Sequence, residues 1–210
     1  MNLFSYVVEH DLGFAPNPFH GFCTLACCKP EIRKKAKEGD YIIGTGATRP
    51  GLLGHITYWM RVDEILTFDE YWSDRRFRYK KPYMEGTTML RYGDNIYHRS
   101  GGKDFQQEDS FHSHEDGSLS RGDLKRDTQK TERVLIGRDF SYWGRNGILL
   151  PEHLQCLVKK GPGHKCRFTE EQIAMFHAWL SNQRERGFKG EPAHWQFIGQ
   201  LKRRPSRARR

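Results

Sequence analysis

The segment GDYIIGTGATRPGLLGHITYWMRVDEIL, residues 39–66, sets the fold that we expect for this chain. Gly39 and Asp40 end a helix and turn the chain into a short buried strand at residues 41–46. A glycine-rich turn follows, and residues 51–66 predict a longer strand whose side chains alternate between two faces. This order of elements predicts an α+β fold built on a small, mixed but mostly antiparallel β-barrel with flanking helices and long loops.

The segments on either side add further elements. Residues 3–8 predict a buried strand, and Thr24 is the expected cap of a helix that runs to Lys37, with Pro30 in its first regular turn. Thr169 opens a capping-box pattern that predicts a helix through about Arg184. Other predicted elements are a helical turn at 68–74, a strand at 134–136, a bend at 140–144 and a short helix at 151–157. Residues 119–132 contain almost no apolar side chains and predict a mobile loop.

Composition indicates a polar globular protein. The chain has 210 residues, of which 36% are hydrophobic and 13% aromatic, so a few large rings can fill one core. We expect a single domain over residues 1–200. No apolar run reaches the length of a membrane span and the N-terminus lacks a signal-peptide pattern, which predicts a soluble, cytoplasmic protein. Five cysteines, an odd number, favour reduced thiols over a disulfide framework.

The net charge of +9 is concentrated at one end of the chain. Residues 201–210 hold six basic side chains and no acidic one, and the other 200 residues carry 29 basic against 26 acidic side chains. We therefore expect a disordered basic tail at 201–210, which either contacts phosphates or acidic partners or remains solvated.

A second basic region begins at Arg75 and extends to Lys103, with aromatic side chains interleaved among the cations. Cations neutralise phosphates and rings stack on bases, so this composition favours a nucleic-acid surface. The alternative is an exposed basic loop that its aromatic rings pin to the core. The predicted nucleic-acid contacts are Arg75, Arg76, Arg78, Lys80, Lys81 and Arg91.

Residues 92–118 are rich in polar side chains and turn signals. Amide side chains pair with adenine-like edges and a carboxylate binds a guanine-like edge, so a base-reading cavity is one interpretation. A polar hairpin that satisfies its own turns is the other. His112, which stands between two serines, is a candidate general base, and Asp94 is a second candidate catalytic group.

The loop GFAPNPFHGFCTLACCKP, residues 13–30, combines prolines, aromatic rings and three cysteines, and such a loop shapes a site more often than it links elements. Cys28 precedes the predicted regular helix and is a candidate nucleophile with His112 as its base. Cys23 is the alternative nucleophile for the same base. Packing as a small buried hydrophobe is the competing role for each cysteine.

Metal and cofactor sites receive less support. His20, Cys23, Cys27 or Cys28, and Cys166 could supply four zinc ligands, but no paired CxxC spacing exists. The glycines and Lys165 of GPGHK, residues 161–165, could grip an anion through backbone amides. No phosphate loop, dinucleotide fingerprint or zinc-deaminase signature is present. We therefore predict no metal and no cofactor.

Two resemblances to known families extend these predictions. Residues 39–66 are similar to the pattern of PUA-like barrels, the group that includes EVE, ASCH and YTH domains, which implies a barrel that binds RNA or a modified base. More of the chain, over residues 6–165, resembles the nucleotide modification associated domain 2 family, on the motifs GFAPNPF, CTLACCKPEIR, GDYIIGTG, YGDNIYHR, SFHS, VLIGRDFSYWG and GPGHK. That resemblance implies a role beside enzymes that hypermodify nucleic-acid bases.

Two classes of function follow, with a third as a further alternative. We expect first a module that binds a base or nucleotide, free or in nucleic acid, and second a base-modifying transferase or hydrolase that uses His112, Asp94 or a cysteine. The third is a subunit that recruits modification enzymes. The predicted ligand-binding residues are Asn17, Thr24, Lys29, Gly44, Thr45, Gly46, Asp94, Asn95, Tyr97, Gln106, Ser110, His112, Ser113, His164 and Lys165.

Overall fold

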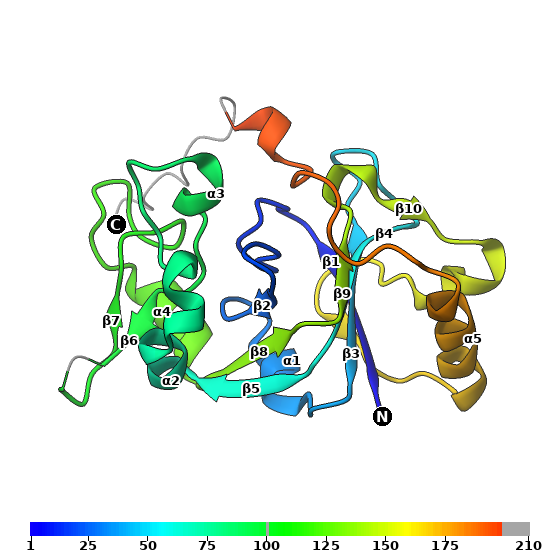
Figure 1. The fold of residues 1–210 in the computed structure, drawn as a ribbon, viewed down its shortest axis with the longest axis horizontal. Helices are drawn as coiled ribbons and strands as arrows, with labels where there is room; N and C mark the ends of the chain where they lie inside the picture. The colour runs from blue at the N-terminus through cyan, green and yellow to red at the C-terminus, as the bar shows by residue number, and fades with distance from the viewer. Residues whose placement is uncertain (100, 199–210) are drawn as a thin grey trace.

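A seven-stranded mixed sheet forms the centre of the protein (Figure 1). The structure is a computed structural model that describes residues 1–99 and 101–198. The strand order is β11 (His164–Lys165), β1 (Leu3–Val8), β3 (Tyr41–Gly46), β4 (His55–Arg61), β9 (Phe140–Tyr142) and β12 (Gly187–Phe188), and β10 (Ile148–Leu149) also pairs with β4. β1 runs parallel to β3 and β12 parallel to β9, whereas the other pairs are antiparallel.

Two smaller sheets complete the strand inventory of the described residues. One has the order β2 (Cys23–Leu25), β8 (Arg133–Gly137) and β5 (Glu64–Thr67), and the other pairs β6 (Tyr97–His98) with β7 (Gln106–Gln107). Figure 1 shows β2, β8 and β5 between the large sheet and a lobe that carries β6, β7, α2 and α4. The α+β class and the mostly antiparallel pairing are confirmed.

The helices of the described residues are short, and none is longer than 12 residues. They are α1 (Pro30–Lys35), α2 (Phe68–Ser73), α3 (Thr88–Arg91), α4 (Arg121–Thr128) and α5 (Glu170–Ser181), with 3₁₀ turns η1 (Arg75–Lys80), η2 (Gly144–Asn146), η3 (Glu152–Leu157) and η4 (Trp195–Phe197). Thr169 caps α5 through a capping box, because its hydroxyl accepts from Gln172 N–H while Gln172 accepts from Thr169 N–H. Among the described residues, no helix is both long enough and apolar enough to cross a membrane.

The expected barrel does not close in the described part of the chain. β11 and β12 end the large sheet on opposite sides and do not pair with each other. The predicted single strand at 51–66 is instead two strands in different sheets, β4 and β5, separated at Asp63. The Asp63 carboxylate accepts the backbone N–H groups of Arg138 and Asp139, which fixes the chain where it passes from one sheet to the other. A PUA-like barrel is therefore not confirmed.

The alternating faces of β1 separate two buried clusters. Phe4, Tyr6 and Val8 pack with β2 and α1, whereas Leu3 packs under η3 and α5. A third cluster joins the 13–30 loop to β6, where Phe14 meets Tyr97 and its neighbours. The proline-rich loop thus lies between the two lobes.

Three other local predictions need correction. Thr24 is not a helix cap but the centre of β2, because its neighbours pair with β8. Residues 121–128 form α4 rather than a mobile loop, and residues 140–142 form β9 rather than a bend. The predicted basic tail at 201–210 lies outside the described residues.

Candidate active site

Three side chains from separate segments meet at the junction of α1 and α4. Cys28 Sγ lies 3.6 Å from His112 Nε2, and His112 Nδ1 lies 2.8 Å from Asp127 Oδ2. Cys28 stands in the turn before α1, His112 in the loop after β7, and Asp127 near the end of α4. A thiol, an imidazole and a carboxylate in this order form the arrangement of a nucleophile, its base and the group that orients the base.

The turn that carries the thiol is held in a left-handed conformation. Cys28 has φ 59° and Lys29 has φ 40°, which are rare values for residues other than glycine. Asp127 Oδ1 accepts the N–H of Cys28 at 2.9 Å, and Arg33 Nε donates to the carbonyl of Cys28 at 2.9 Å. Such conformations cost about 1–3 kcal/mol each and persist where surrounding contacts impose them. The strain therefore falls at the candidate nucleophile.

Arg33, in α1, links the turn that carries Cys28 to α4, which carries Asp127. It is buried, and besides Cys28 it donates to the backbone carbonyls of Asp127 and Arg133. Burial lowers the pKa of Arg33, while the nearby Asp127 carboxylate raises it. Because one guanidinium binds three carbonyls from three segments, it fixes the position of the Cys28 turn relative to α4.

The loop around His112 is fastened by its own serines. His112 N–H donates to Ser110 Oγ at 3.3 Å, and Ser113 Oγ donates to the carbonyl of Glu108 at 3.0 Å. Gln107 Nε2 donates to the carbonyl of His112 at 3.2 Å, and the Phe14 ring packs edge-on 4.5 Å from the imidazole. Ser110 and Ser113 thus support the imidazole, whereas the predicted Gln106 is exposed to solvent.

The pKa values of His112 and Asp127 favour a positive imidazolium beside a negative carboxylate. Burial lowers the pKa of His112, but the electrostatic interaction with Cys28 and the hydrogen bond to Asp127 outweigh it and raise the pKa to about 9. Burial raises the pKa of Asp127, but its bond to His112 and the charges around it hold that pKa well below its usual range. At neutral pH, His112 is therefore an imidazolium between a sulfur and a carboxylate.

Two further groups complete the surroundings of the triad. Tyr97 Oη donates to Asp127 Oδ2 at 3.0 Å. Arg126 Nη2 lies 3.2 and 3.1 Å from the two ring nitrogens of His112, so it contacts the ring as a whole rather than one lone pair. Arg126 also pairs with Asp123 and Asp127, and its side chain is 37% exposed. Arg126 is thus a partly exposed cation in contact with His112, the type of group that stabilises a negative oxygen.

Several predicted ligand residues form a buried network instead of lining a cavity. Thr24 Oγ1 and Tyr71 Oη donate to the two oxygens of Asp94, at 2.7 and 2.8 Å. Lys80 Nζ donates to the backbone and side-chain oxygens of Asn17, at 2.9 and 2.7 Å. All of these groups are buried, and burial is the main cause that raises the pKa of Asp94 and lowers that of Lys80 to about 8. Their bonds hold the 13–30 loop in place.

The remaining predicted ligand residues are scattered. Asn95 Nδ2 donates to the carbonyl of Tyr71, inside the same network. Gly44 and Thr45 are buried in β3, where a side chain at Gly44 would collide with the Tyr58 ring. Lys165 Nζ donates to the carbonyl of Cys156 at 2.7 Å, and its neighbour His164 lies in β11.

Some of the predicted nucleic-acid residues are bound to other groups of the protein, and some are exposed to solvent. Lys80 is buried, Arg76 binds Glu64 and Asp74, and Lys81 Nζ lies 3.4 Å above the Trp72 ring. Arg75, Arg78 and Arg91 are exposed, and Arg76 is exposed as well although its guanidinium is paired.

One set of potential metal ligands overlaps the triad. Cys27, His112 and Asp127 offer ligand atoms within 4.8 Å of one another, the only such group of three in residues 1–99 and 101–198. The set with His20, Cys23 and Cys166 that the sequence allowed is therefore not assembled there. Burial raises the pKa of Cys27 well above its usual value, and its thiol donates to the carbonyl of Asp94.

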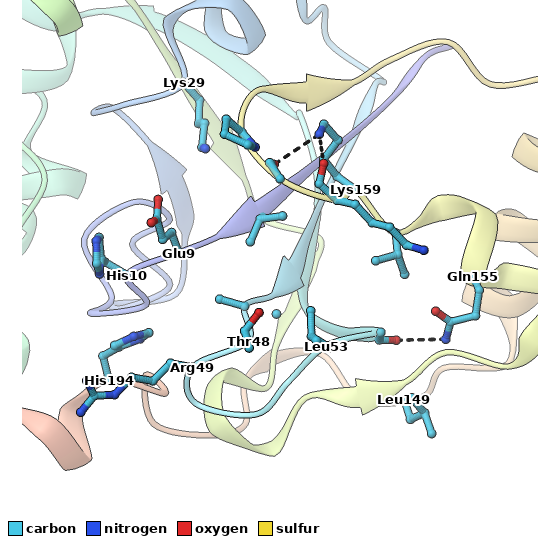
Figure 2. A pocket seen from close by; sticks show the side chains of 18 of the residues that line it. Glu9, His10, Lys29, Thr48, Arg49, Leu53, Leu149, Gln155, Lys159 and His194 are labelled. Carbon is cyan, nitrogen blue, oxygen red and sulfur yellow. Dashed lines mark hydrogen bonds between the residues drawn. The ribbon is translucent and has the colours of Figure 1, made fainter.

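The chain also contains a pocket of about 940 Å³ (Figure 2). Lys29, the residue after Cys28, lies in its wall, and its amine stands 4.5 Å from the centre of the Tyr6 ring. Gly46 is the other predicted ligand residue in the lining. The triad side chains themselves are not among the lining residues, so Lys29 is the link between the two sites.

Asp127 and Arg126 escaped the sequence analysis because residues 119–132 predicted a mobile loop. A local signal was available, since Ser120 and Asp123 have the spacing of a helix start. In the structure, Ser120 Oγ accepts from Asp123 N–H and caps α4. The cap places Asp127 on the second turn of α4, where it reaches His112.

Comparison with known proteins finds a family model that covers the whole described chain. The family model for nucleotide modification associated domain 2 matches residues 1–199. No curated protein and no solved structure shows a significant match. The match spans every element that builds the triad and the pocket, and the chain belongs to the nucleotide modification associated domain 2 family.

Proposed function

We propose that this protein is a thiol-dependent acyl-transfer enzyme, a transferase or amidohydrolase, that acts on an acyl or amide group carried by a nucleotide or its base. The observation that carries the proposal is the Cys28–His112–Asp127 group, with its 3.6 Å and 2.8 Å contacts. The family's association with nucleotide modification supplies the substrate class. This is the enzyme alternative of the sequence analysis, with Cys28 and His112 as the acting pair among the candidates named there.

The steps follow from the charges at the site. The Cys28 thiolate attacks the carbonyl carbon of the substrate, and the carbonyl oxygen becomes negative beside Arg126. The bond from carbon to the leaving nitrogen or oxygen breaks, and the proton on His112 passes to the leaving group. The resulting thioester is attacked by water or an amine, which gives a proton to His112 as the carbon–sulfur bond breaks. The thiolate is thereby restored, and Asp127 holds the imidazole throughout.

The base-reading pocket expected from residues 94–113 receives less support as a function. The polar side chains that were to read a base are bound to one another in the buried Asp94 network. A ligand therefore has more room in the pocket at Lys29.

The test is covalent trapping at the thiol. The protein is incubated with p-nitrophenyl acetate, a generic acyl donor, and the acylated residue is located by mass spectrometry of its peptides. We expect a burst of nitrophenol and an acetyl group on Cys28, with loss of both in Cys28→Ala. Cys166→Ser is the matched control, because Cys166 is an exposed thiol far along the chain.

A second measurement uses alkylation by iodoacetamide at pH 6. Cys28 should react at least about tenfold faster than Cys166, and His112→Ala should remove the difference. Equal rates at the two thiols, together with no acetyl group on Cys28, would show that the triad is not a nucleophilic site.

A further inference from the structure

The pocket that Lys29 lines collects positive charge from three segments of the chain. Its basic side chains are Lys29, Arg49, Lys159 and Lys160, with His10 and His194, and its one carboxylate is Glu9. Figure 2 shows Lys29, Arg49 and Lys159 around one hollow, with Glu9 and His10 at its side. The strand β1 runs along the floor through Val7.

The lysines of this pocket have no acidic partner among the described residues. Lys159 Nζ donates to the backbone carbonyls of Lys160 and Gly161, the latter at 3.2 Å. Within residues 1–99 and 101–198, no carboxylate lies within 4.0 Å of the amine of Lys29, Lys159 or Lys160. Burial lowers the pKa of Lys29, although the electrostatic interactions with Cys28 and Glu9 oppose the shift. Gathered cations repel one another, so a bound anion would relieve their repulsion.

The same pocket exposes apolar surface. Leu53 and Leu149 are each 61% exposed, unusually open for leucines that face a cavity. Val158, Pro162 and Phe197 extend this apolar surface. A volume of about 940 Å³ lies within the range of pockets that hold drug-sized ligands, roughly 300–1,000 Å³. The ligand that fits has an anionic end and a flat or apolar end.

We infer that this pocket binds a nucleoside 5′-phosphate. The phosphate lies against Lys159, Lys160 and Lys29, and the base packs on Leu53 and Leu149. The inference deepens the proposed function and rests on it for one point, that the bound nucleotide presents its acyl or amide group to Cys28 past Lys29. Binding itself requires no reaction, so it is measured separately.

The experiment is a calorimetric titration of the Cys28→Ser protein with thymidine and adenosine 5′-monophosphates and with the two nucleosides. We expect at least one monophosphate to bind about tenfold or more tightly than its nucleoside, since charge-assisted bonds to phosphate are the stronger ones. The double variant Lys159→Ala/Lys160→Ala should weaken monophosphate binding by about tenfold or more.

The matched control is Lys34→Ala/Lys37→Ala, which removes the same charge from exposed positions outside the pocket. It should leave affinity within about twofold. Leu149→Glu provides a second pocket variant, because it places a carboxylate on the apolar surface where the base packs and should also weaken binding. Thermal unfolding of each variant verifies that it is folded.

The outcomes separate the two proposals. If no monophosphate binds up to millimolar concentration, or if the lysine and control variants weaken binding equally, the pocket inference is wrong, whatever Cys28 does. If monophosphates bind through Lys159 and Lys160 but Cys28 is neither acylated nor unusually reactive, the pocket stands and the thiol mechanism fails. A 5′-phosphorylated oligonucleotide that binds through the same lysines would identify a strand end as the source of the phosphate.

Discussion

His112 Nδ1 lies 2.8 Å from Asp127 Oδ2, although one residue belongs to a serine-rich loop and the other to the end of a helix. The same carboxylate accepts the N–H of Cys28 through its second oxygen at 2.9 Å. Asp127 thus positions both the candidate base, His112, and the backbone of the candidate nucleophile, Cys28. The Asp127 carboxylate organises this group of side chains. Asp94, the carboxylate that the sequence analysis named, is instead bound by Thr24 and Tyr71 in the buried network.

Asp127→Asn should therefore reduce acylation of Cys28 by about a hundredfold or more, because the amide keeps the size and loses the charge that holds the imidazolium. The pKa of His112 should fall toward its ordinary value in this variant. The measurement is the burst rate with p-nitrophenyl acetate against pH. Asp116→Asn, which changes an exposed turn residue, is the control and should behave as the unmodified protein. Equal loss in both variants would contradict a positioning role.

Stability should depend on pH through His112. Its pKa is about 9 in the folded protein and about 6.5 in an unfolded chain, so protonation stabilises the fold. This contribution is complete below about pH 6.5 and is lost as the pH rises through 9, on the order of 3 kcal/mol in all. Thermal or denaturant unfolding between pH 6 and pH 10 measures it, with His112→Gln as reference. A difference between the two proteins that stays constant over this range would argue against the ion pair.

The two adjacent cysteines should separate in their roles. Cys27 is buried among Phe14, Tyr71 and their neighbours, so Cys27→Ala should lower the free energy of unfolding by about 1–2 kcal/mol and leave acylation in place. Cys28→Ala should abolish acylation with a smaller effect on stability. Peptide mapping after acylation, together with urea unfolding, makes the comparison. Loss of acylation in Cys27→Ala with a folded protein would move the nucleophile to Cys27.

Lys80→Met should lower the free energy of unfolding by about 3–5 kcal/mol. The change leaves buried oxygens of Asn17 and Phe22 without the ammonium that binds them. Arg78→Met, a similar change at an exposed residue of the same turn, should remain within about 0.5 kcal/mol of the original stability. Denaturant titration of the two variants decides the point, and similar losses would show that the Asn17 contacts carry little weight.

The predicted nucleic-acid surface can be tested on the exposed arginines that lack the ion pairs of Arg76. Arg75→Ala/Arg78→Ala/Arg91→Ala should weaken binding of single-stranded DNA and lower the salt slope by about 2, at roughly 0.7 per phosphate contact. Arg76→Ala is the control, because its guanidinium is bound by Glu64 and Asp74. Fluorescence anisotropy at several salt concentrations gives both quantities. An unchanged slope in the triple variant would remove this surface from nucleic-acid binding.

The sequence by itself determined the elements whose signals are local. The apolar run of β1, the Gly39-Asp40 turn into β3, the proline in the first turn of α1 and the capping box of α5 all appear where their patterns predict them. The prediction failed where neighbouring strands decided the outcome, as at Thr24, which β8 draws into a strand. Local propensity carries no information on such pairing.

Only the tertiary structure decided which candidates share a site. Cys28 and His112 are 84 positions apart, and the sequence could name both without showing that they meet. It could not find Asp127, whose role depends on the packing of α4 against α1, nor could it show that Asp94 and Lys80 are buried in a structural network. The sequence determines which chemical groups the chain contains. The distance between two side chains is set by the packing of the elements that carry them.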